Sequence, residues 1–382
     1  MKVDFYHHQL SSADAKGIAD VLDTPFLTTG TICQQVEKQL AEYFGASHAM
    51  LANSWTNGAL ATLMAMGIGP GDEIIVPATT FVASANIVEL LGAKTVLVDV
   101  DPATLLISPE AASKAVTKKT KAIMPVHLYG QMVDVSKLRK IIDEVSHGDQ
   151  YIYILEDSAH CFEGSLNGAK PGQFSDACAF SFYATKNVTC GEGGAVIFRN
   201  ASLYEKTLET RLHGMSATAV DRFKGGKYNH WDMMQLGTKA NLPDLLAVLL
   251  PKQIKEIDDR LPLRQALCDK YYAAFENTPI RLVEKVEGCK DACHLFTIGV
   301  REDFRDEAIN ILNENGISVT VNFRALPDLT YYGDKYPETK SSCLNAIVWG
   351  RQTISLPLYP GLREDHQDHV IDTVLNKIEP LL

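Results

Sequence analysis

The feature of this sequence that most constrains its fold is a repeated alternation of short apolar runs with amphipathic, helix-like stretches. Several of the runs, such as IIVP at 74–77 and YIYIL at 151–155, are continuously apolar. A strand needs such a run when helices cover both faces of a parallel sheet. We therefore predict an α/β protein with a mostly parallel seven-stranded sheet, whose strands are expected at 49–52, 73–77, 95–99, 121–127, 151–156, 177–182 and 195–198.

Helix-like stretches lie between these runs, at 31–44, 57–66, 84–91 and 135–145. In the first of them, Ile32, Val36, Leu40 and Phe44 recur at every fourth position, and Gly45 follows as a helix stop. After residue 250 the pattern changes to a charged helical stretch, then to a strand at 294–300, a helix at 303–315 and a further strand at 317–323. We therefore expect a large domain at 1–250 and a smaller C-terminal α/β domain at 251–382.

The composition is that of an ordinary globular enzyme. The 382 residues exceed one ordinary core, and 46% of them are hydrophobic and 22% charged. No apolar run approaches the roughly 20 residues that a bilayer span needs, and the opening MKVDFYHHQL lacks the apolar segment of a secretion signal. We therefore expect a cytoplasmic protein without a membrane partner. The net charge of -11 argues against a nucleic-acid partner, because phosphate backbones require a basic surface.

The eight cysteines are scattered along the chain. They lack the paired short spacings of a zinc site or of a disulfide framework. Free cysteines are often simply buried in a core. We interpret them as reduced thiols and expect no bound metal.

An acidic cluster stands at the end of the predicted strand at 151–156. The strand runs into Glu156 and Asp157, which Ser158, Ala159 and His160 follow. Ligands of open α/β sheets bind outside the carboxyl ends of the strands, so this position favours a functional role. Taken alone, a carboxylate here is more often a helix cap or a loop residue.

The second candidate is Lys186, which lies in SFYATKNVTCGEGG after a strand-like run and before a glycine-rich turn. Lysine is rarely buried without a function. A lysine amine in such a position can form a Schiff base with an aldehyde cofactor. Pyridoxal 5'-phosphate (PLP) also needs an anionic partner for its ring nitrogen, because the protonated ring is the better electron sink. Asp157 is the candidate for that partner.

The turn SWTNG at 54–58 leads into the predicted helix at 57–66. Unpaired N–H groups at a helix N-terminus bind phosphate, so Thr56 and Asn57 are candidates for the phosphate of PLP, with Ser181 as a further hydroxyl donor. Phe81, in TTFVAS, could stack on the pyridine ring. Each feature also has an ordinary explanation, since the turn could be a plain helix cap and the phenylalanine could pack in the core.

Long segments of the chain resemble the DegT/DnrJ/EryC1/StrS sugar aminotransferase family, PLP-dependent enzymes of the aspartate aminotransferase fold type (fold type I). The matching segments are GIGPGDEIIVPATTFVASAN, AIMPVHLYGQMVDV, EDSAHCFEGSLNGAKPGQFSDACAFSFYATKNVTCGEGGAVI, RLHGM and ISLPLYPGL. They extend in order over nearly the whole chain, which is far more specific than any short motif. The resemblance implies the fold type I architecture, with a large PLP-binding domain and a smaller C-terminal domain.

The resemblance also implies roles for individual residues. Lys186 matches the lysine that binds PLP covalently, Asp157 matches the carboxylate that pairs with the ring nitrogen, and His160 matches a residue on the ring hydroxyl side. Phe81 matches the aromatic residue that stacks on the ring. The phosphate-binding positions of the family match Thr56, Asn57 and Ser181.

A further phosphate donor in this family comes from the neighbouring subunit, and Asn241 in QLGTKANLPD occupies its place. The resemblance therefore implies a homodimer with shared active sites. Two departures from the family pattern are visible: GTKAN differs from the G-Y-N-Y-R that is common there, and Trp55 stands where small residues are usual. Relatives that carry histidine in place of the lysine catalyse dehydration, so Lys186 favours transamination.

The resemblance implies transfer of an amino group from glutamate to a nucleotide-linked keto-sugar, in aminosugar or surface polysaccharide biosynthesis. Lys186, Asp157 and His160 are then the catalytic residues. A UDP-4-keto-hexose is the favoured substrate, because HLYG, NVTCGEGG and VNFRA are typical of the branch that makes 4-amino sugars. Candidate contacts to the two substrates are Arg222, Lys227, Tyr228 and His230, in one glycine-containing loop, and Arg324.

Three alternatives stay open. Transfer could take place at C3 of the sugar, or on a non-nucleotide ring of an antibiotic precursor. A PLP-binding regulatory protein without turnover is a second alternative, which the complete set of Asp157, His160 and Lys186 disfavours. A Rossmann dehydrogenase would fit the sheet, but the sequence lacks a G-x-G-x-x-G turn after its first strand.

Overall fold

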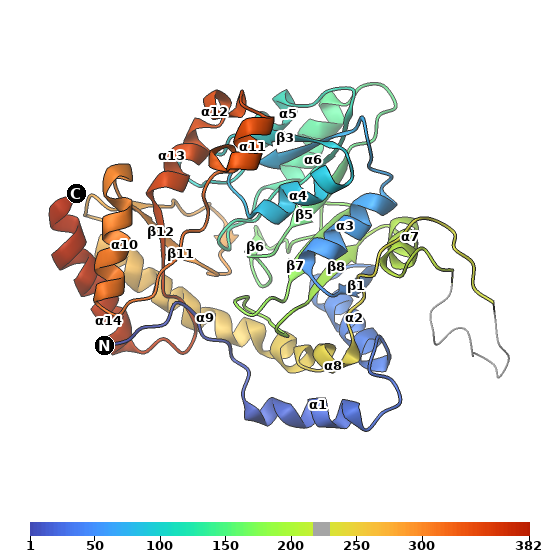
Figure 1. Cartoon of the computed structure of the whole chain (residues 1–382), viewed down its shortest axis with the longest axis horizontal. Helices are drawn as coiled ribbons and strands as arrows, with labels where there is room; N and C mark the ends of the chain where they lie inside the picture. The colour runs from blue at the N-terminus through green and yellow to red at the C-terminus, as the bar shows by residue number, and fades with distance from the viewer. Residues whose placement is uncertain (217–229) are drawn as a thin grey trace.

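The protein, described by a computed structural model at residues 1–216 and 230–382, is centred on a seven-stranded sheet (Figure 1). Its strands are β1 (His48–Ala52), β2 (Glu73–Pro77), β3 (Lys94–Val98), β4 (Thr120–Ile123), β5 (Tyr153–Asp157), β7 (Ala177–Ser181) and β8 (Gly194–Phe198). Their order in the sheet is β1-β8-β7-β5-β4-β2-β3. Only β8 runs antiparallel to its neighbours, β1 and β7. The predicted mostly parallel sheet is therefore confirmed.

Helices cover both faces of this sheet, as its continuously apolar strands require. They are α2 (Thr31–Phe44), α3 (Trp55–Ala65), α4 (Val82–Leu90), α5 (Pro109–Lys114), α6 (Val135–Val145), α7 (Ala201–Arg211) and α8 (Asp244–Ala247). Helix α1 (Ala15–Leu22) contacts α8 and lies apart from the sheet (Figure 1). In β8, Val196 and Phe198 pack in the hydrophobic cluster that contains α3 and α4, whereas Ala195 and Ile197 pack in the cluster that contains α2. Alternate side chains of β8 thus pack in two hydrophobic clusters, one on each face of the sheet.

The predicted helix at 31–44 shows how local sequence sets an element. Val36, Leu40 and Phe44 are buried on one side of α2, as their fourfold spacing predicts. Gly45 ends the helix with a φ of 60°, a left-handed conformation that glycine adopts without steric cost. The helices predicted at 57–66, 84–91 and 135–145 are also present, as α3, α4 and α6.

The C-terminal part contains a three-stranded antiparallel sheet of order β12-β11-β9, made of β9 (Arg281–Leu282), β11 (Phe296–Gly299) and β12 (Thr353–Leu356). Two short strands, β6 (Ser165–Leu166) and β10 (Cys289–Lys290), pair separately. The helices here are α9 (Leu250–Phe275), α10 (Arg305–Glu314), α11 (Thr330–Lys335), α12 (Thr339–Ser342), α13 (Leu344–Gln352) and α14 (Glu364–Thr373). The predicted strand at 294–300 and helix at 303–315 are confirmed as β11 and α10.

The prediction of a strand at 317–323 was wrong. Its alternating apolar and polar residues are typical of a strand, but the segment makes only single bridges, from Ile317 to Val3 and from Thr320 to Ser355. Each flanking segment meets it at one residue, so no ladder forms. The third strand of the small sheet is β12 instead.

Hydrophobic packing crosses residue 250, where the sequence predicted a domain boundary. Val3 packs in the C-terminal cluster together with Tyr271. Ala325 and Trp349, from the C-terminal part, pack in the cluster of the large sheet. Helix α9 contributes Ile254 to a cluster of the large sheet and Tyr271 to the C-terminal cluster. The helix runs from beside α8 toward the C-terminal helix α14 (Figure 1). The division into 1–250 and 251–382 stays a prediction.

In the described parts of the chain, no helix combines the length and the apolar character that a membrane crossing requires.

Candidate active site

A cavity of about 500 Å³ lies at the carboxyl ends of β5 and β7. Asp157, the last residue of β5, and Ser181, the last residue of β7, line it together with Lys186. Thr56 and Phe81, at the beginnings of α3 and α4, complete this side of the wall. The position agrees with the general location of ligand sites in open α/β sheets, and the volume is typical of a small-molecule site.

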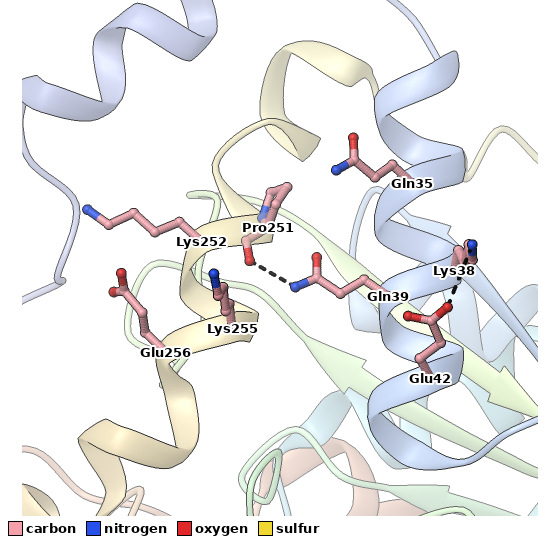
Figure 2. Close-up of a pocket in the computed structure, with 8 residues that line it drawn as sticks. All are labelled: Gln35, Lys38, Gln39, Glu42, Pro251, Lys252, Lys255 and Glu256. Atoms are coloured by element: carbon pink, nitrogen blue, oxygen red, sulfur yellow. Dashed lines mark hydrogen bonds and ion pairs between the residues drawn. The ribbon is translucent and has the colours of Figure 1, made fainter.

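A larger and more open hollow of about 690 Å³ lies on the outer surface between α2 and α9 (Figure 2). Gln39 donates a hydrogen bond of 2.9 Å to the carbonyl of Pro251 across it, and Lys38 pairs with Glu42 on its rim. None of the described residues that the sequence predicted for catalysis or cofactor binding lines it. We therefore assign the candidate active site to the cavity at β5 and β7.

Asp157 is a buried carboxylate with a prepared set of donors. Its Oδ2 accepts a hydrogen bond of 2.8 Å from Ser84 Oγ, and its Oδ1 accepts one of 3.1 Å from the N–H of Ala159. Burial raises the pKa of Asp157, although these two hydrogen bonds and the charge of Lys186 act in the opposite direction. A cationic group placed in the cavity would further favour the ionised form of this carboxylate.

Lys186 follows β7 in a loop that returns to the sheet at β8. Burial lowers the pKa of its amine to about 8, and the nearby charge of Asp157 opposes this shift. A neutral amine is the form that attacks a carbonyl carbon. The cavity therefore holds a lysine whose nucleophilic form is accessible near neutral pH.

His160 is neutral and has a defined proton position. Its Nδ1 accepts a hydrogen bond of 3.2 Å from the N–H of Tyr129, so the ring proton resides on Nε2. Burial holds the pKa of His160 well below its ordinary value, and the proximity of Lys186 and His294 adds to this effect. Phe323 stacks on the imidazole with ring centroids 5.7 Å apart.

The N-terminus of α3 forms a corner of the cavity whose donors suit an anion. Ser54 caps the helix and accepts the N–H of Asn57 at 3.1 Å, while the earlier N–H groups, at Trp55 and Thr56, have no acceptor within a helix. Such groups and the helix dipole favour a phosphate. Gly194 allows this close approach of β8, because a Cβ there would lie 2.5 Å from the backbone nitrogen of Trp55.

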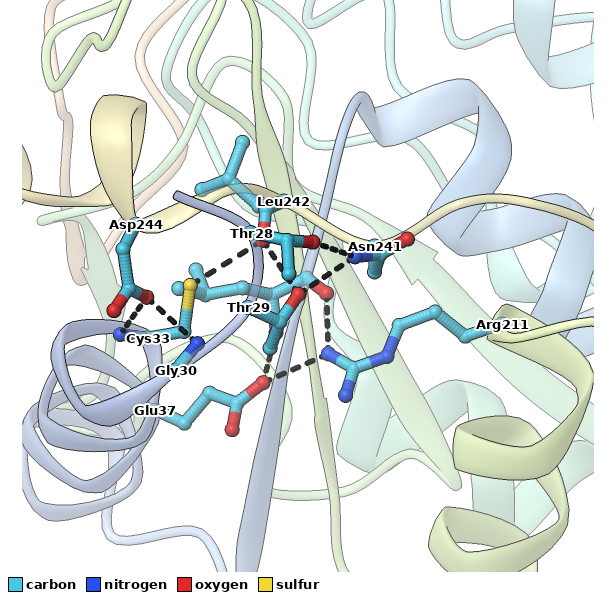
Figure 3. Close-up of polar contacts among 10 residues, drawn as sticks. Thr28, Thr29, Gly30, Cys33, Glu37, Arg211, Asn241, Leu242 and Asp244 are labelled. Atoms are coloured by element: carbon cyan, nitrogen blue, oxygen red, sulfur yellow. Dashed lines mark hydrogen bonds and ion pairs between the residues drawn. The ribbon is translucent and has the colours of Figure 1, made fainter. Parts of the chain in front are cut away.

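Two predicted phosphate ligands lie outside this wall. Asn57 uses its side chain within the turn, where Nδ2 donates 2.9 Å to Asn53 Oδ1. Asn241 Nδ2 donates to the hydroxyls of Thr29, at 2.7 Å, and Thr28, at 3.3 Å (Figure 3). Among the described residues, its buried Oδ1 has no hydrogen-bond partner. A function of Asn241 in a neighbouring subunit stays a prediction.

The predicted substrate residues are placed less favourably. Arg324 is exposed, lies outside the wall and donates a hydrogen bond of 2.7 Å to the carbonyl of Asp328. His230 is exposed and also lies outside the wall. Three further candidates lie outside the described residues, namely Arg222, Lys227 and Tyr228.

The sequence did not indicate several residues of the wall, among them Ser84, His294 and Phe323. Ser84 could have been found from its position four residues after Thr80 at the beginning of a helix. The hydroxyl oxygens of the two residues are 2.9 Å apart. His294 and Phe323 come from segments far along the chain, which only the tertiary fold brings to this cavity.

The residues present fit PLP. Asp157 offers a buried carboxylate for the ring nitrogen, and Lys186 offers an amine for the aldehyde. The beginning of α3 and Ser181 offer donors for a phosphate. Phe81 lines the cavity although 56% of its surface is exposed, so one face of its ring is available for stacking.

Comparisons with known proteins agree with this chemistry. Residues 8–375 match the model of the DegT/DnrJ/EryC1/StrS aminotransferase family. The spore coat polysaccharide biosynthesis protein SpsC of Bacillus subtilis is 34% identical over 371 residues, which cover 96% of this chain and 94% of that protein. The structure is similar to the PMP form of the putative sugar aminotransferase Spr1654 from Streptococcus pneumoniae, with a TM-score of 0.92, 28% identity and 99% of each chain covered.

The PLP form of Spr1654 superimposes with a TM-score of 0.91 at 27% identity, over 100% of both chains. PseC of Helicobacter pylori, an aminotransferase involved in the biosynthesis of pseudoaminic acid, gives a TM-score of 0.89 at 25% identity, also over 100% of both chains. The fold is accordingly the PLP-dependent fold type I, and PLP is the cofactor. With the family pattern matched over nearly its full length, the chain belongs to the DegT/DnrJ/EryC1/StrS family of PLP-dependent aminotransferases.

Proposed function

We propose that this protein transfers an amino group from glutamate to a nucleotide-linked keto-sugar, with a UDP-4-keto-hexose as the substrate class. The product would serve the biosynthesis of aminosugars or surface polysaccharides. The observation that carries the proposal is the meeting of Asp157, His160 and Lys186 in one cavity of a chain from an aminotransferase family. The names of SpsC, a polysaccharide biosynthesis protein, and Spr1654, a putative sugar aminotransferase, support a sugar as the acceptor.

Lys186 has two tasks in this proposal. PLP, when bound, supplies an electron sink for the pair of electrons released at the substrate carbon. Lys186 would hold the cofactor through Nζ until the amino group of the donor displaces it, and the freed amine would then move a proton from the substrate carbon to a second carbon of the bound molecule. The lowered pKa of about 8 suits both tasks, because a general base works best when its pKa is close to the working pH.

Asp157 and His160 hold the two sides of the cofactor ring. Asp157 keeps a negative charge beside the ring nitrogen, and Ser84 and Ala159 fix the directions of its two oxygens. His160 offers the hydrogen on Nε2 as a donor toward the ring hydroxyl side, since its Nδ1 is occupied by the N–H of Tyr129. These residues therefore orient the ring from its two sides.

The remaining residues anchor and complete the site. Phe81 covers one face of the ring, and Thr56 and Ser181 bind the phosphate at the beginning of α3. Asn57 supports this corner through the helix cap with Ser54. In a homodimer with shared active sites, Asn241 contributes a further phosphate contact to the neighbouring subunit. The proposed substrate contacts are Arg222, Lys227, Tyr228, His230 and Arg324.

The test is to incubate the PLP-loaded enzyme with glutamate and a panel of nucleotide-linked keto-sugars, and to determine the product masses. We expect an aminosugar nucleotide and an equal amount of 2-oxoglutarate, with the 4-keto-hexoses reacting best. Lys186→Ala should abolish turnover and the visible absorbance of the loaded enzyme, whereas Lys118→Ala, at an exposed lysine, should change neither. Activity retained in Lys186→Ala would disprove the assignment of this lysine.

Two further outcomes separate the alternatives. Formation of 2-oxoglutarate from glutamate without any sugar product would reject the keto-sugar substrates but retain an aminotransferase. Absence of both products would instead favour a PLP-binding protein without turnover.

A further inference from the structure

Two histidines stand side by side in the cavity wall. His160 follows β5 and His294 precedes β11, yet their ring centroids are 4.5 Å apart. Both side chains are nearly buried, at 8% and 6% exposure, and both line the cavity together with Lys186. Each buried ring needs a defined hydrogen-bond partner, so the positions of their protons can be derived from the neighbouring atoms.

His294 has its proton on Nδ1, because Asn187 allows no other arrangement. Asn187 Nδ2 donates both of its hydrogens, at 2.8 Å to Glu163 Oε1 and at 3.1 Å to the carbonyl of Ala292. This fixes the orientation of the amide, and its Oδ1 then lies 3.1 Å from His294 Nδ1. Since an amide oxygen can only accept, Nδ1 carries the hydrogen and Nε2 carries the lone pair.

His160 has the opposite tautomer. The N–H of Tyr129 donates to its Nδ1, which leaves the hydrogen on Nε2. The two adjacent rings therefore differ in what they offer the cavity at Nε2. His160 offers a donor and His294 offers an acceptor.

The tautomer of His294 is anchored deep in the protein. Glu163, which orients Asn187, forms an ion pair with Arg264 of α9, and both side chains are almost fully buried. Asn187 is also the residue directly after Lys186. One network thus joins α9, the loop of the lysine and the segment before β11.

We propose that His294 is a positioning residue for Lys186: its Nε2 is a permanent hydrogen-bond acceptor that orients the lysine amine and stabilises its protonated form. The inference rests on the proposed function of Lys186 as the cofactor-binding residue. The donor at His160 faces the ring of the cofactor, whereas ammonium and amine N–H groups need an acceptor, which His294 supplies.

The charged groups around His294 keep it neutral. Lys186 and Arg264 both lower the pKa of His294, in addition to the larger effect of burial, so that it lies well below its ordinary value. Glu163 is paired with Arg264, and His160 is itself uncharged. Two carboxylates also line the wall, namely Asp157, which acts on Lys186, and Glu192. The acceptor on Nε2 is therefore present throughout the working pH range.

The first test determines the tautomers directly. Long-range ¹H–¹⁵N spectra of the PLP-loaded wild-type enzyme, with ¹⁵N-labelled histidine, distinguish a proton on Nδ1 from one on Nε2. We expect the Nδ1 form for His294 and the Nε2 form for His160. His127 is an internal reference of the second kind, because its Nδ1 accepts the N–H of Val133 at 3.1 Å and its Nε2 lies 2.6 Å from Glu156. A proton on Nε2 of His294 near neutral pH would overturn the proposal.

The second test measures the effect on Lys186. A hydrogen bond to the protonated form raises the pKa of a nitrogen base. The visible absorbance of the loaded enzyme reports protonation of the Lys186 nitrogen, so His294→Phe should lower the pH midpoint of its change by about one unit. His294→Gln retains an acceptor and should restore most of the shift. An unchanged midpoint in a PLP-loaded His294→Phe variant would reject the proposal.

The two measurements also separate the inference from the proposed function. A wild-type enzyme that shows no visible absorbance with PLP would reject Lys186 as the cofactor-binding residue, whatever the tautomer of His294. A normal absorbance with the wrong tautomer, or with an unshifted midpoint, rejects only the positioning by His294. If His294→Phe fails to fold or to load PLP, the spectra of the wild-type enzyme decide.

Discussion

Ser84 Oγ, in the first turn of α4, donates a hydrogen bond of 2.8 Å to Oδ2 of Asp157 at the end of β5. The donor is itself held by Thr80, whose Oγ1 lies 2.9 Å away. This contact joins two elements that the sequence places far apart, and it fixes the carboxylate that faces the cavity.

Removal of this donor should weaken the binding of PLP. A hydrogen bond to a charged group contributes about 1.5–3 kcal/mol, so Ser84→Ala should lower the affinity by about tenfold or more. Titration of the apoenzyme with PLP, followed by absorbance, measures the effect. Ser113→Ala is the matched control, because its hydroxyl donates a hydrogen bond to the carbonyl of Glu110 on α5 and Ser113 does not line the cavity. Equal affinities of the two variants would contradict the assigned function of Ser84.

The lowered pKa of Lys186 predicts how cofactor loading depends on pH. With a pKa of about 8, about a tenth of the amine is neutral at pH 7, and the neutral fraction rises toward one above pH 9. The rate of PLP capture by the apoenzyme, measured by stopped-flow absorbance, should therefore rise with pH, with a midpoint near 8, and level off above about pH 9. A rate that continues to rise to the pKa of an ordinary lysine would show that burial does not act on this amine.

The same shift has a consequence for the stability of the apoenzyme. Because the folded-state pKa lies below the unfolded value, the unfolded chain binds more protons between pH 8 and 10, and stability contributed by Lys186 should increase over this interval. Lys186→Met should remove that increase, and thermal unfolding at several pH values measures the difference. Parallel pH profiles of the two proteins would contradict the shift.

The buried ion pair of Glu163 and Arg264 should be sensitive to loss of one partner. Arg264→Met leaves a buried carboxylate without its counter-ion, which typically costs about 3–5 kcal/mol in the free energy of unfolding. Urea unfolding measures the loss. Lys137→Met, which breaks the exposed pair with Glu110, should change the midpoint little. The double change Glu163→Leu and Arg264→Met should recover part of the loss, because it removes the buried carboxylate that the single change leaves without a counter-ion.

Asn241 provides a test of shared active sites. In a homodimer, a Lys186→Ala subunit combined with an Asn241→Ala subunit contains one site in which both residues are intact. Mixing and refolding the two variants should thus restore activity that neither has alone, as measured by formation of 2-oxoglutarate. If Asn241 acted within its own subunit, neither site of the mixed dimer would be intact, and no activity would return.

The strands and the first two site residues could be predicted from the sequence because they depend on local signals. Continuous apolar runs located the strands of the large sheet. Asp157 is the last residue of one of these strands, and Lys186 lies in the loop that follows another. The strand ends meet at one edge of the sheet, so their order alone brings these two residues together.

The other side of the cavity depends on tertiary packing and could not be predicted in this way. His294 is a single polar residue before an apolar strand, and nothing near it in the sequence indicates that His160 will lie beside it. Arg324 was predicted from its position, but its neighbours Asn322 and Phe323 line the wall, whereas Arg324 lies outside it and bonds to the carbonyl of Asp328. Asn57 was misplaced because α3 begins at Trp55, two residues before the predicted start.

The placement of Val3 bears on how this chain can be divided. Val3 packs in the C-terminal cluster and bridges to Ile317. A fragment that starts at residue 251 would therefore have a hydrophobic gap at the position of the Val3 side chain. Helix α9 also connects the two parts of the chain, because its 26 residues supply side chains to a cluster of the large sheet and to the C-terminal cluster. During synthesis on the ribosome, Val3 is made long before the C-terminal residues that it contacts. The C-terminal cluster can therefore complete its packing only after those residues have also been made.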